Sequence, residues 1–244
     1  APDIGAYEAQ VAPFSVGFNF VGGRSGVAGG TLASGDIAGV PAVAQGNWNN
    51  LTTDFAGSHA GTYTNGPTPA LAADGSAFSP NLRLWWDASA TYTSSGTAPT
   101  PATPPDERLM FGYLDSNNSG DGRAATNLRT NATGQPYFAV AGLPAAATLG
   151  GYRVLVYADG DAANSASPRK SEYWLTTFRQ TDTSNVASEV PLTPSLFIGD
   201  TANFSGTYTR GTGTSDATAT AGANYVQFDG LTEPGGFMVR AEES

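Results

Sequence analysis

The amino-acid sequence predicts an all-β fold, a two-sheet β-sandwich that is jelly-roll-like and has long loops rich in Gly, Pro and Thr. Three observations predict it. Short runs alternate apolar or aromatic residues with polar or small ones, helical periodicity is nearly absent, and Gly, Pro, Asn or Asp separates almost every run from the next. Many short strands with turn signals between them are typical of sandwiches and jelly rolls.

The predicted strands follow one another along most of the chain. The first, residues 14–21, alternates large apolar with small or polar residues and ends at Gly22. Residues 152–157 are apolar at nearly every position, which is typical of a central strand. Further strands are expected at residues 82–86, 108–114, 137–141, 173–178, 195–198, 204–209, 225–228 and 236–240.

The segments between these strands are expected to be loops, with two short helix candidates. The helix candidates are residues 37–43 and 51–55. Residues 93–105 contain four prolines, which cannot donate backbone hydrogen bonds to a sheet, and residues 62–79 and 211–222 are rich in Gly, Ala, Thr or Pro. The expected core comprises Phe18, Phe20, Trp48, Leu84, Met110, Val154, Val156, Phe228 and Val239.

Length and composition limit the class of protein. The chain has 244 residues and no segment that reads as an interdomain linker, so we expect one sandwich domain over residues 14–244, preceded by an N-terminal arm of residues 1–13. With 11 Lys+Arg against 21 Asp+Glu the net charge is -10, which disfavours binding to nucleic acid or to anionic lipid. No apolar stretch is long enough for insertion in a membrane.

Composition also predicts the compartment. Only 13% of residues are charged, Thr and Ser are frequent, and the chain opens with Ala1-Pro2-Asp3, as a processed exported protein would. We therefore expect a secreted or cell-surface protein. The absence of cysteine excludes disulfides and thiolate chemistry within the chain.

The segment Asn47-Trp48-Asn49-Asn50 is the most distinctive candidate site. An indole face stacks on a pyranose ring while amides bond its hydroxyls, so these four residues predict a carbohydrate-binding site. The alternative is that Trp48 fills the core and the asparagines cap a turn.

Trp86 is a second candidate for the same role. It follows Trp85 in a predicted strand, where successive side chains point to opposite faces. One indole of the pair is therefore expected in the core and the other on the surface, where Trp86 is the proposed sugar platform.

Several motifs resemble one family of secreted proteins. They are residues 17–23, 37–40, 45–51, 109–115 and 154–161, in that order. In this pattern the chain resembles largely uncharacterised β-sandwich domains of secreted and cell-surface bacterial proteins, which carry an asparagine-tryptophan-asparagine-asparagine motif and often occur beside carbohydrate-binding or adhesion modules. The resemblance implies no catalytic residue. Such domains often close with one more strand, and its absence here suggests a strand that is missing, replaced or supplied by another chain.

Calcium is the one cofactor that the sequence suggests. Asp115, Asn117, Ser119 and Asp121 place oxygen side chains at every second position, as in a calcium loop, but Thr126 stands where the loop would have its bidentate Glu. The alternative is a polar turn between strands. A second acidic turn contains Asp159 and Asp161, and the two turns would form one site if their strands were neighbours.

No residue pattern supports catalysis. The single histidine, His59, lies in the glycine-flanked turn 57–61, and no pair of carboxylates is singled out by spacing as a glycosidase would require. We therefore expect a protein that is not an enzyme, with a glycan-active hydrolase as the least favoured reading.

The N-terminal arm is a candidate assembly element. Its apolar residues Ile4, Tyr7 and Val11 are interleaved with polar ones, and a segment this short cannot fold alone. It either pairs with a neighbouring subunit or folds back along its own sheet edge. We therefore expect a structural subunit that binds copies of itself in a filament, sheath or surface layer. The alternative is a carbohydrate-binding module whose partner is an extracellular polysaccharide.

Overall fold

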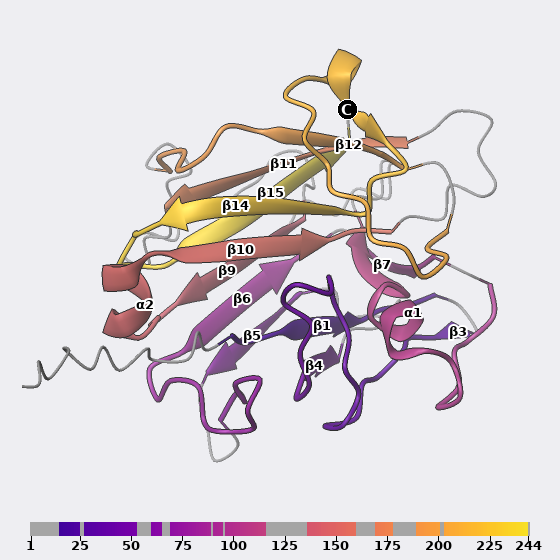
Figure 1. The fold of residues 1–244 in the computed structure, drawn as a ribbon, viewed down its shortest axis with the longest axis horizontal. Coiled ribbons are helices and arrows are strands. Elements are labelled where there is room, and N and C mark those ends of the chain that lie inside the picture. Colours follow the sequence, from indigo (N-terminus) through magenta and orange to yellow (C-terminus); the bar gives the residue numbers. More distant parts are fainter. Residues whose placement is uncertain are drawn as a thin grey trace, which may run out of the picture.

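The computed structural model describes residues 15–24, 27–52, 60–64, 69–88, 90–94, 96–115, 136–159, 169–177, 189–200 and 203–243, and shows a predominantly β fold (Figure 1). Its largest element is a seven-stranded sheet in the order β13-β12-β11-β15-β9-β6-β5. All neighbours in this sheet are antiparallel except β12 and β13. Its strands are β5 (Ala60–Thr64), β6 (Arg83–Asp87), β9 (Tyr137–Ala141), β11 (Arg169–Thr177), β12 (Leu196–Asp200), β13 (Thr220–Ala221) and β15 (Phe237–Glu243).

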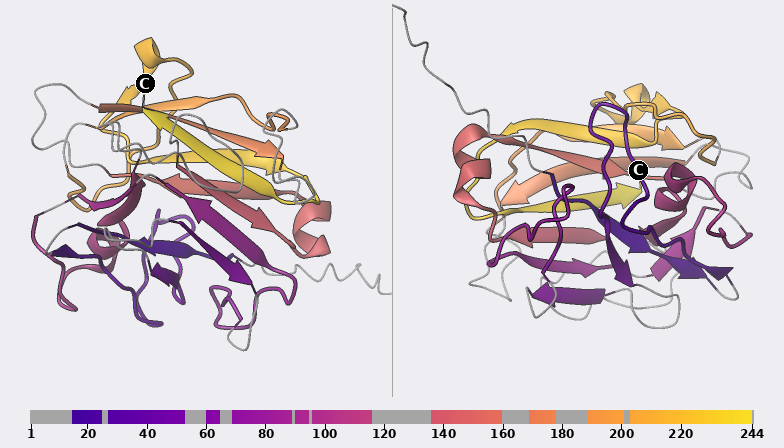
Figure 2. Two further views of the ribbon diagram at one scale, coloured as in Figure 1. Left: turned by 180° about the vertical axis from the view of Figure 1, so that it is seen from behind. Right: turned by 60° about the horizontal axis from the view of Figure 1, so that its bottom comes forward.

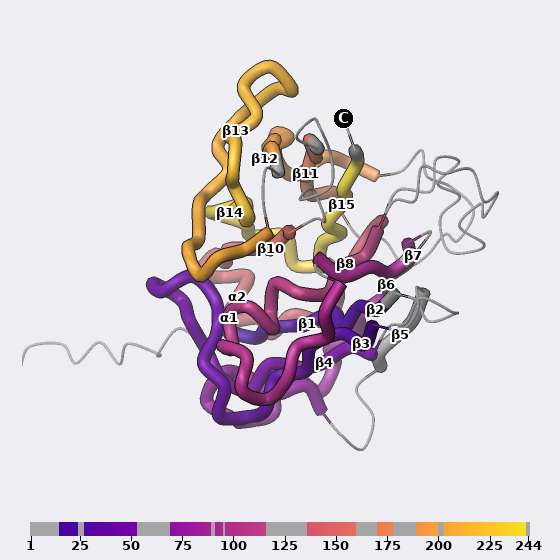
Figure 3. Tube along the Cα trace, turned by 90° about the vertical axis from the view of Figure 1, so that its right-hand side faces the viewer, coloured from indigo at the N-terminus to yellow at the C-terminus, as the bar shows by residue number. Residues whose placement is uncertain are grey.

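Four strand pairs complete the described structure. The two that matter for the site are β1 (Phe18–Val21), which runs parallel to β4 (Asn49–Thr52), and β10 (Tyr152–Tyr157), which is antiparallel to β14 (Tyr225–Leu231). Both pairs lie in front of the large sheet in Figure 1, and the other views show β10 and β14 on one side of β11 and β15 (Figures 2 and 3). The remaining pairs are β2 (Gly23–Arg24) with β3 (Val27–Ala28), and β7 (Ala90–Thr93) with β8 (Gly112–Asp115).

One hydrophobic core joins the large sheet to β10 and β14. It contains Leu84, Val140 and Leu175 from the sheet together with Val226 and Phe228 from β14, all nearly inaccessible to solvent. Of the expected core residues, Leu84, Met110, Phe228 and Val239 are buried. Phe18, Phe20, Val154 and Val156 are half-buried and pack against the same core, while Trp48 packs on a second, smaller cluster.

Two α-helices and one 3-10 helix (Asp216–Thr218) are present in the described residues, and none lies where the sequence suggested a helix. A strand was expected at residues 108–114, but its first residues belong to α1 (Pro105–Leu109). Only its last residues form a strand, β8. Pro105 is favourable in the first helical turn, with Asp106 and Glu107 near the positive end of the helix dipole and Arg108 near its negative end. α2 (Ala145–Gly150) begins just after Pro144 in the same way.

Three further expectations were wrong. Residues 41–43 form a turn rather than a helix, residues 51 and 52 belong to β4, and residues 203–209 contain no strand. The last error has a physical cause, because Tyr208 uses its side chain to bond another segment and residues 205–207 are exposed. Among the described residues, no helix is long and apolar enough to cross a membrane.

Candidate functional site

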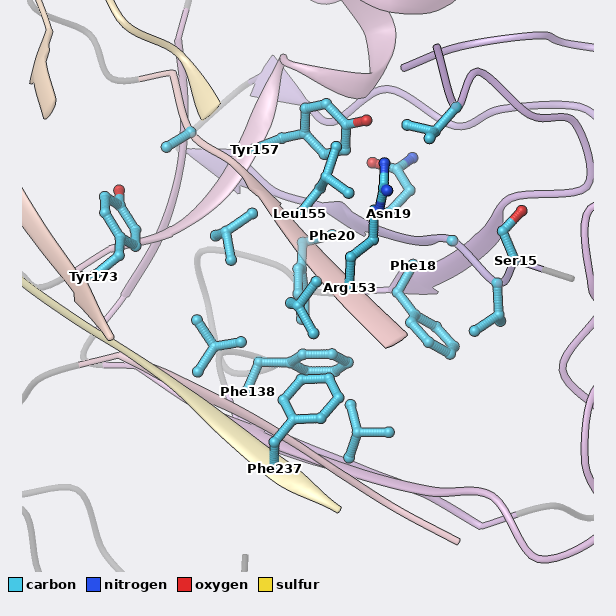
Figure 4. A pocket seen from close by; sticks show the side chains of 18 of the residues that line it. Ser15, Phe18, Asn19, Phe20, Phe138, Arg153, Leu155, Tyr157, Tyr173 and Phe237 are labelled. Carbon is cyan, nitrogen blue, oxygen red and sulfur yellow. The ribbon is translucent and has the colours of Figure 1, made fainter. Parts of the chain in front are cut away.

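The main concave feature is an apolar slot of about 1370 Å³ between β1 and β10, with the large sheet as its floor. Figure 4 shows it with Phe18 and Phe20 on β1, Leu155 and Tyr157 on β10, and Phe138 and Phe237 on the sheet below. The floor also includes Val140, Tyr173, Ile198 and Val239. We call this feature the slot.

The walls of the slot are strand edges. Every residue from Ser15 to Phe20 and every residue from Tyr152 to Asp159 lines it. A strand that meets a cavity with one face alone contributes alternate residues, because successive side chains point to opposite faces. The continuous runs therefore mean that the backbone edges of β1 and β10 border the slot.

Only one edge of each strand is paired in the described part of the chain. β10 pairs with β14, and β1 pairs with β4. The carbonyl oxygens of Ser15 and Gly17 accept the backbone N–H groups of Ala73 and Asn49, both at 2.9 Å. Backbone groups of successive residues alternate between the two edges of a strand, so those of Val16 and Phe18 face away from β4.

An aromatic and polar network lies between the loop before β4 and the end of β10. The backbone N–H of Val40 donates to the Tyr157 Oη at 3.1 Å, and Tyr157 meets the indole of Trp48 edge to face with ring centroids 6.0 Å apart. The carboxylate of Asp106 accepts the backbone N–H of Gly39 and the Tyr208 hydroxyl, each at 2.8 Å. These contacts fix the loop before β4 against the end of β10.

Burial changes the acidity of the tyrosines in and near this network. Burial raises the pKa of Tyr157 above its ordinary value of 10.0. For Tyr208 burial raises the pKa further, helped by its hydrogen bond to the Asp106 carboxylate, which favours the protonated phenol. At the other end of the slot burial and nearby Glu233 raise the pKa of Tyr152 to about 12.

The amides of the asparagine-tryptophan segment bond within the protein. The side chain of Asn49 donates to the Gly17 and Leu71 carbonyls at 3.0 and 2.9 Å and accepts the Leu71 N–H at 2.8 Å. Asn50 bonds both backbone groups of Leu32 and accepts from the Asn19 amide.

The first two residues of the same segment are also held internally. Asn47, at a positive φ of 52°, donates to the Ala73 carbonyl, and the indole N–H of Trp48 donates to the Gln45 carbonyl at 2.9 Å. The segment therefore fixes β4 against its neighbours.

The expectation of an exposed Trp86 was wrong. Its indole is 7% exposed and meets Phe20 edge to face, whereas Trp85 is half-buried on the other face of the sheet against Tyr137 and Met238. Because side chains alternate along β6, the two indoles must lie on opposite faces of the sheet. Which of them is buried depends on β1, which packs over Trp86.

The two acidic turns of the calcium prediction are described only in part. Asp115 ends β8 and Asp159 follows β10, where the Asp159 carboxylate accepts the Phe204 N–H at 3.0 Å. Both residues line the slot. Asn117, Ser119, Asp121 and Asp161 lie outside the described residues, and among the described residues no three His, Cys, Asp or Glu side chains form a metal-binding group. Calcium binding stays a prediction.

The expected assembly residues Ile4, Tyr7 and Val11, and also His59, lie outside the described residues. The slot itself was not predicted. The sequence predicted a central strand at residues 152–157, because they are apolar at nearly every position. Among the described residues that strand, β10, has one neighbour, β14, and its other edge borders the slot.

Comparison of the chain with models of known protein families, with curated proteins and with solved structures finds no match.

Proposed function

We propose that the protein is a self-assembling structural subunit of an extracellular or cell-surface filament, sheath or layer, and that its role is not enzymatic. The observation that carries this proposal is the slot, an apolar cavity bordered by two strand edges. Exposed strand edges pair with strands of other chains, and apolar side chains exposed beside them favour that pairing. The low charge content and the motifs shared with secreted domains support the location outside the cell.

The fold that suits this role is a two-layer β-sandwich with jelly-roll-like topology. In this arrangement the seven-stranded sheet forms one layer, and β14, β10, β1 and β4 form the other. The second layer is interrupted between β10 and β1, where the slot lies. A layer interrupted in this way is a site for another strand.

The test is to measure the size of the full chain over a range of concentrations by sedimentation velocity and by electron microscopy. The expected result is growth from monomers to ordered multimers with concentration. A protein that remains monomeric and monodisperse up to millimolar concentration would contradict the proposal.

Carbohydrate binding is the alternative, and the observation in its favour is that the half-buried rings of Trp48 and Tyr157 line the slot. The asparagine amides give carbohydrate binding less support, because they bond within the protein.

The substitution Asn49→Ala distinguishes a structural role of this side chain from a role in sugar binding. If Asn49 is structural, the substitution lowers the free energy of unfolding by about 2 kcal/mol or more, since it leaves backbone groups unpaired. If it binds sugar, stability is kept and retention on polysaccharide is lost.

A further inference from the structure

We propose that the slot receives a β-strand formed by residues 5–11 of a neighbouring copy, so that each subunit completes the sandwich of the next. The proposal deepens the proposed function and depends on it, because it names the segment and the surface that make the intersubunit contact. Four observations carry it: the edges of the slot, its floor, the pattern of the segment and the turn that folding back would need.

The edges provide the hydrogen-bonding groups that an inserted strand requires. β14 occupies one edge of the six-residue strand β10, and because the Ala158 N–H bonds the Asn224 carbonyl on that edge, the backbone groups of Leu155 and Tyr157 face the other. β1 offers the backbone groups of Val16 and Phe18, which alternate away from the edge that bonds β4. A strand lying between them would bond both walls, as in strand-addition complexes.

The floor provides an apolar surface for one face of that strand. Phe18 and Phe20 lie within 5.7 and 5.3 Å of Phe138, measured between ring centroids, and Tyr152 stacks on Phe237 at 5.8 Å. The aromatic rings and valines of β1 and β10 are nonetheless only half-buried. Burying them further is favourable in proportion to the apolar area that is removed from water.

The segment has the alternation that this site requires. Gly5, Tyr7, Ala9 and Val11 fall on one face of an extended strand, while Ala6, Glu8 and Gln10 fall on the other. The first set suits the apolar floor and the second suits solvent. Seven extended residues span about 23 Å at about 3.3 Å per residue, enough to run along the whole of β10.

No other segment outside the described residues has this pattern. Residues 116–135 contain Leu128 as their one large aliphatic residue, and residues 160–168 contain none. Residues 53–59 and 178–188 each have isolated apolar residues without alternation.

The sequence favours a neighbour's segment over the chain's own. Residues 5–11 precede β1 directly, so folding back into the slot beside β1 would require a tight hairpin at residues 12–15. The tightest hairpins, with two-residue loops, need Gly, Asn or Asp at positive φ, and Ala12-Pro13-Phe14-Ser15 contains none of these, so a fold-back would need a longer loop that uses all four residues. A segment from another copy enters without any turn. The contact is then heterologous, and repeating it produces a ring if the rotation between copies closes and an open chain if it does not.

The test compares two full-length variants that each add two carboxylates to the same segment. Tyr7→Asp with Val11→Asp changes the face toward the floor, and Ala6→Asp with Gln10→Asp changes the opposite face. In sedimentation velocity the first variant is expected to need at least ten times more protein to form multimers than wild type, and the control less than three times. Circular dichroism spectra of both should match that of wild type.

A second measurement uses the intact slot of the first variant. A chain that cannot donate its segment still accepts one, so adding it in equal amount to wild type should shorten the multimers by capping their ends. Unchanged multimer length, or equal loss of assembly in both variants, would overturn the proposal.

The outcomes also separate this proposal from the proposed function. A wild-type protein that stays monomeric contradicts both. Wild-type multimers that persist in the Tyr7→Asp, Val11→Asp variant contradict the inserted strand alone and leave self-assembly in place. Loss of monomer stability in that variant, with no change in assembly, would show that the segment fills the slot of its own chain and would overturn the intersubunit contact.

Discussion

Among the described residues, the ion pair between Arg240 and Glu189 is the most buried, with side-chain exposures of 4% and 10% and an N–O distance of 2.6 Å. Arg240 also lies 5.5 Å from the ring centre of Tyr137, and the Thr176 hydroxyl donates to the same carboxylate. These groups hold β9, β11 and β15 together on the face of the large sheet opposite the slot. Removing one member of a buried ion pair is strongly destabilising, because the other charge is left buried without a partner.

Arg240→Met should therefore be strongly destabilising, because it leaves the Glu189 carboxylate buried and unpaired. The expected loss is about 3–5 kcal/mol of unfolding free energy, measured by denaturant titration. Lys170→Met is the matched control, since it breaks an ion pair of 3.0 Å whose side chains are 35% and 55% exposed, and should cost under about 1 kcal/mol. Similar losses in the two variants would show that burial does not decide the strength of these pairs.

The tyrosines around the slot predict a loss of stability in alkali. In the folded protein the pKa of Tyr152 is about 12, and the pKa values of Tyr157 and Tyr208 are also raised above 10.0. Because the unfolded chain loses these protons first, the stabilisation is complete below pH 10 and falls as the pH rises toward the folded pKa values. Unfolding free energy should therefore decline steadily above pH 10.

Absorbance at 295 nm checks the cause, because it follows phenolate formation. In the folded protein a group of tyrosines should titrate with pKa values well above the ordinary 10.0, whereas all tyrosines of the denatured protein should titrate with pKa values close to 10. Coincident titration curves for the folded and unfolded protein would contradict the proposed burial of these hydroxyls.

At the scale of elements, the position of β8 is fixed by a close backbone approach to β1. A Cβ atom added to Gly112 would collide with the backbone N of Gly22, and one added to Gly22 would collide with the Tyr92 carbonyl. The β7–β8 pair therefore sits against the end of β1 only because these positions have no side chain. This contact closes one end of the slot, where Gly112 and Tyr113 line it.

Gly112→Ala should accordingly destabilise the protein by about 1–3 kcal/mol, since backbone atoms cannot move aside as a flexible side chain can. Gly35→Ala is the control, because a Cβ there meets nothing within 4 Å and the expected change is within about 0.5 kcal/mol. Thermal unfolding of the two variants measures the difference. Equal melting temperatures would mean that β8 does not approach β1 as closely as the structure has it.

At the scale of the whole molecule, charge opposes the proposed assembly. Each subunit carries a net charge of -10, so identical subunits repel one another over distances comparable with the Debye length. The contact surface itself is apolar and depends little on salt.

Added salt should therefore promote assembly. Raising NaCl from 10 to 200 mM is expected to lower the protein concentration at which multimers form, as measured by light scattering. Weaker assembly at high salt would indicate that the subunits associate through ion pairs instead of an inserted strand.

The sequence by itself determined that the fold is predominantly β, because alternation of apolar and polar residues and frequent turn residues are local properties that each strand displays alone. It placed the strands at residues 137–141, 152–157 and 225–228 close to β9, β10 and the start of β14. The errors at residues 105–109 and 204–209 lie where a few capping residues or a tertiary hydrogen bond outweighed the local pattern.

Only the tertiary structure decided which strands are neighbours. Strand order, the burial of Trp86 beneath β1, and the pairing of β10 with a single strand among the described residues all depend on contacts between residues far apart in the sequence. The apolar pattern of residues 152–157 predicted a central strand, whereas in the described part of the chain β10 has β14 as its one neighbour. The physical reason is that a side-chain pattern reports which faces are apolar, whereas pairing is made by backbone groups that every residue shares.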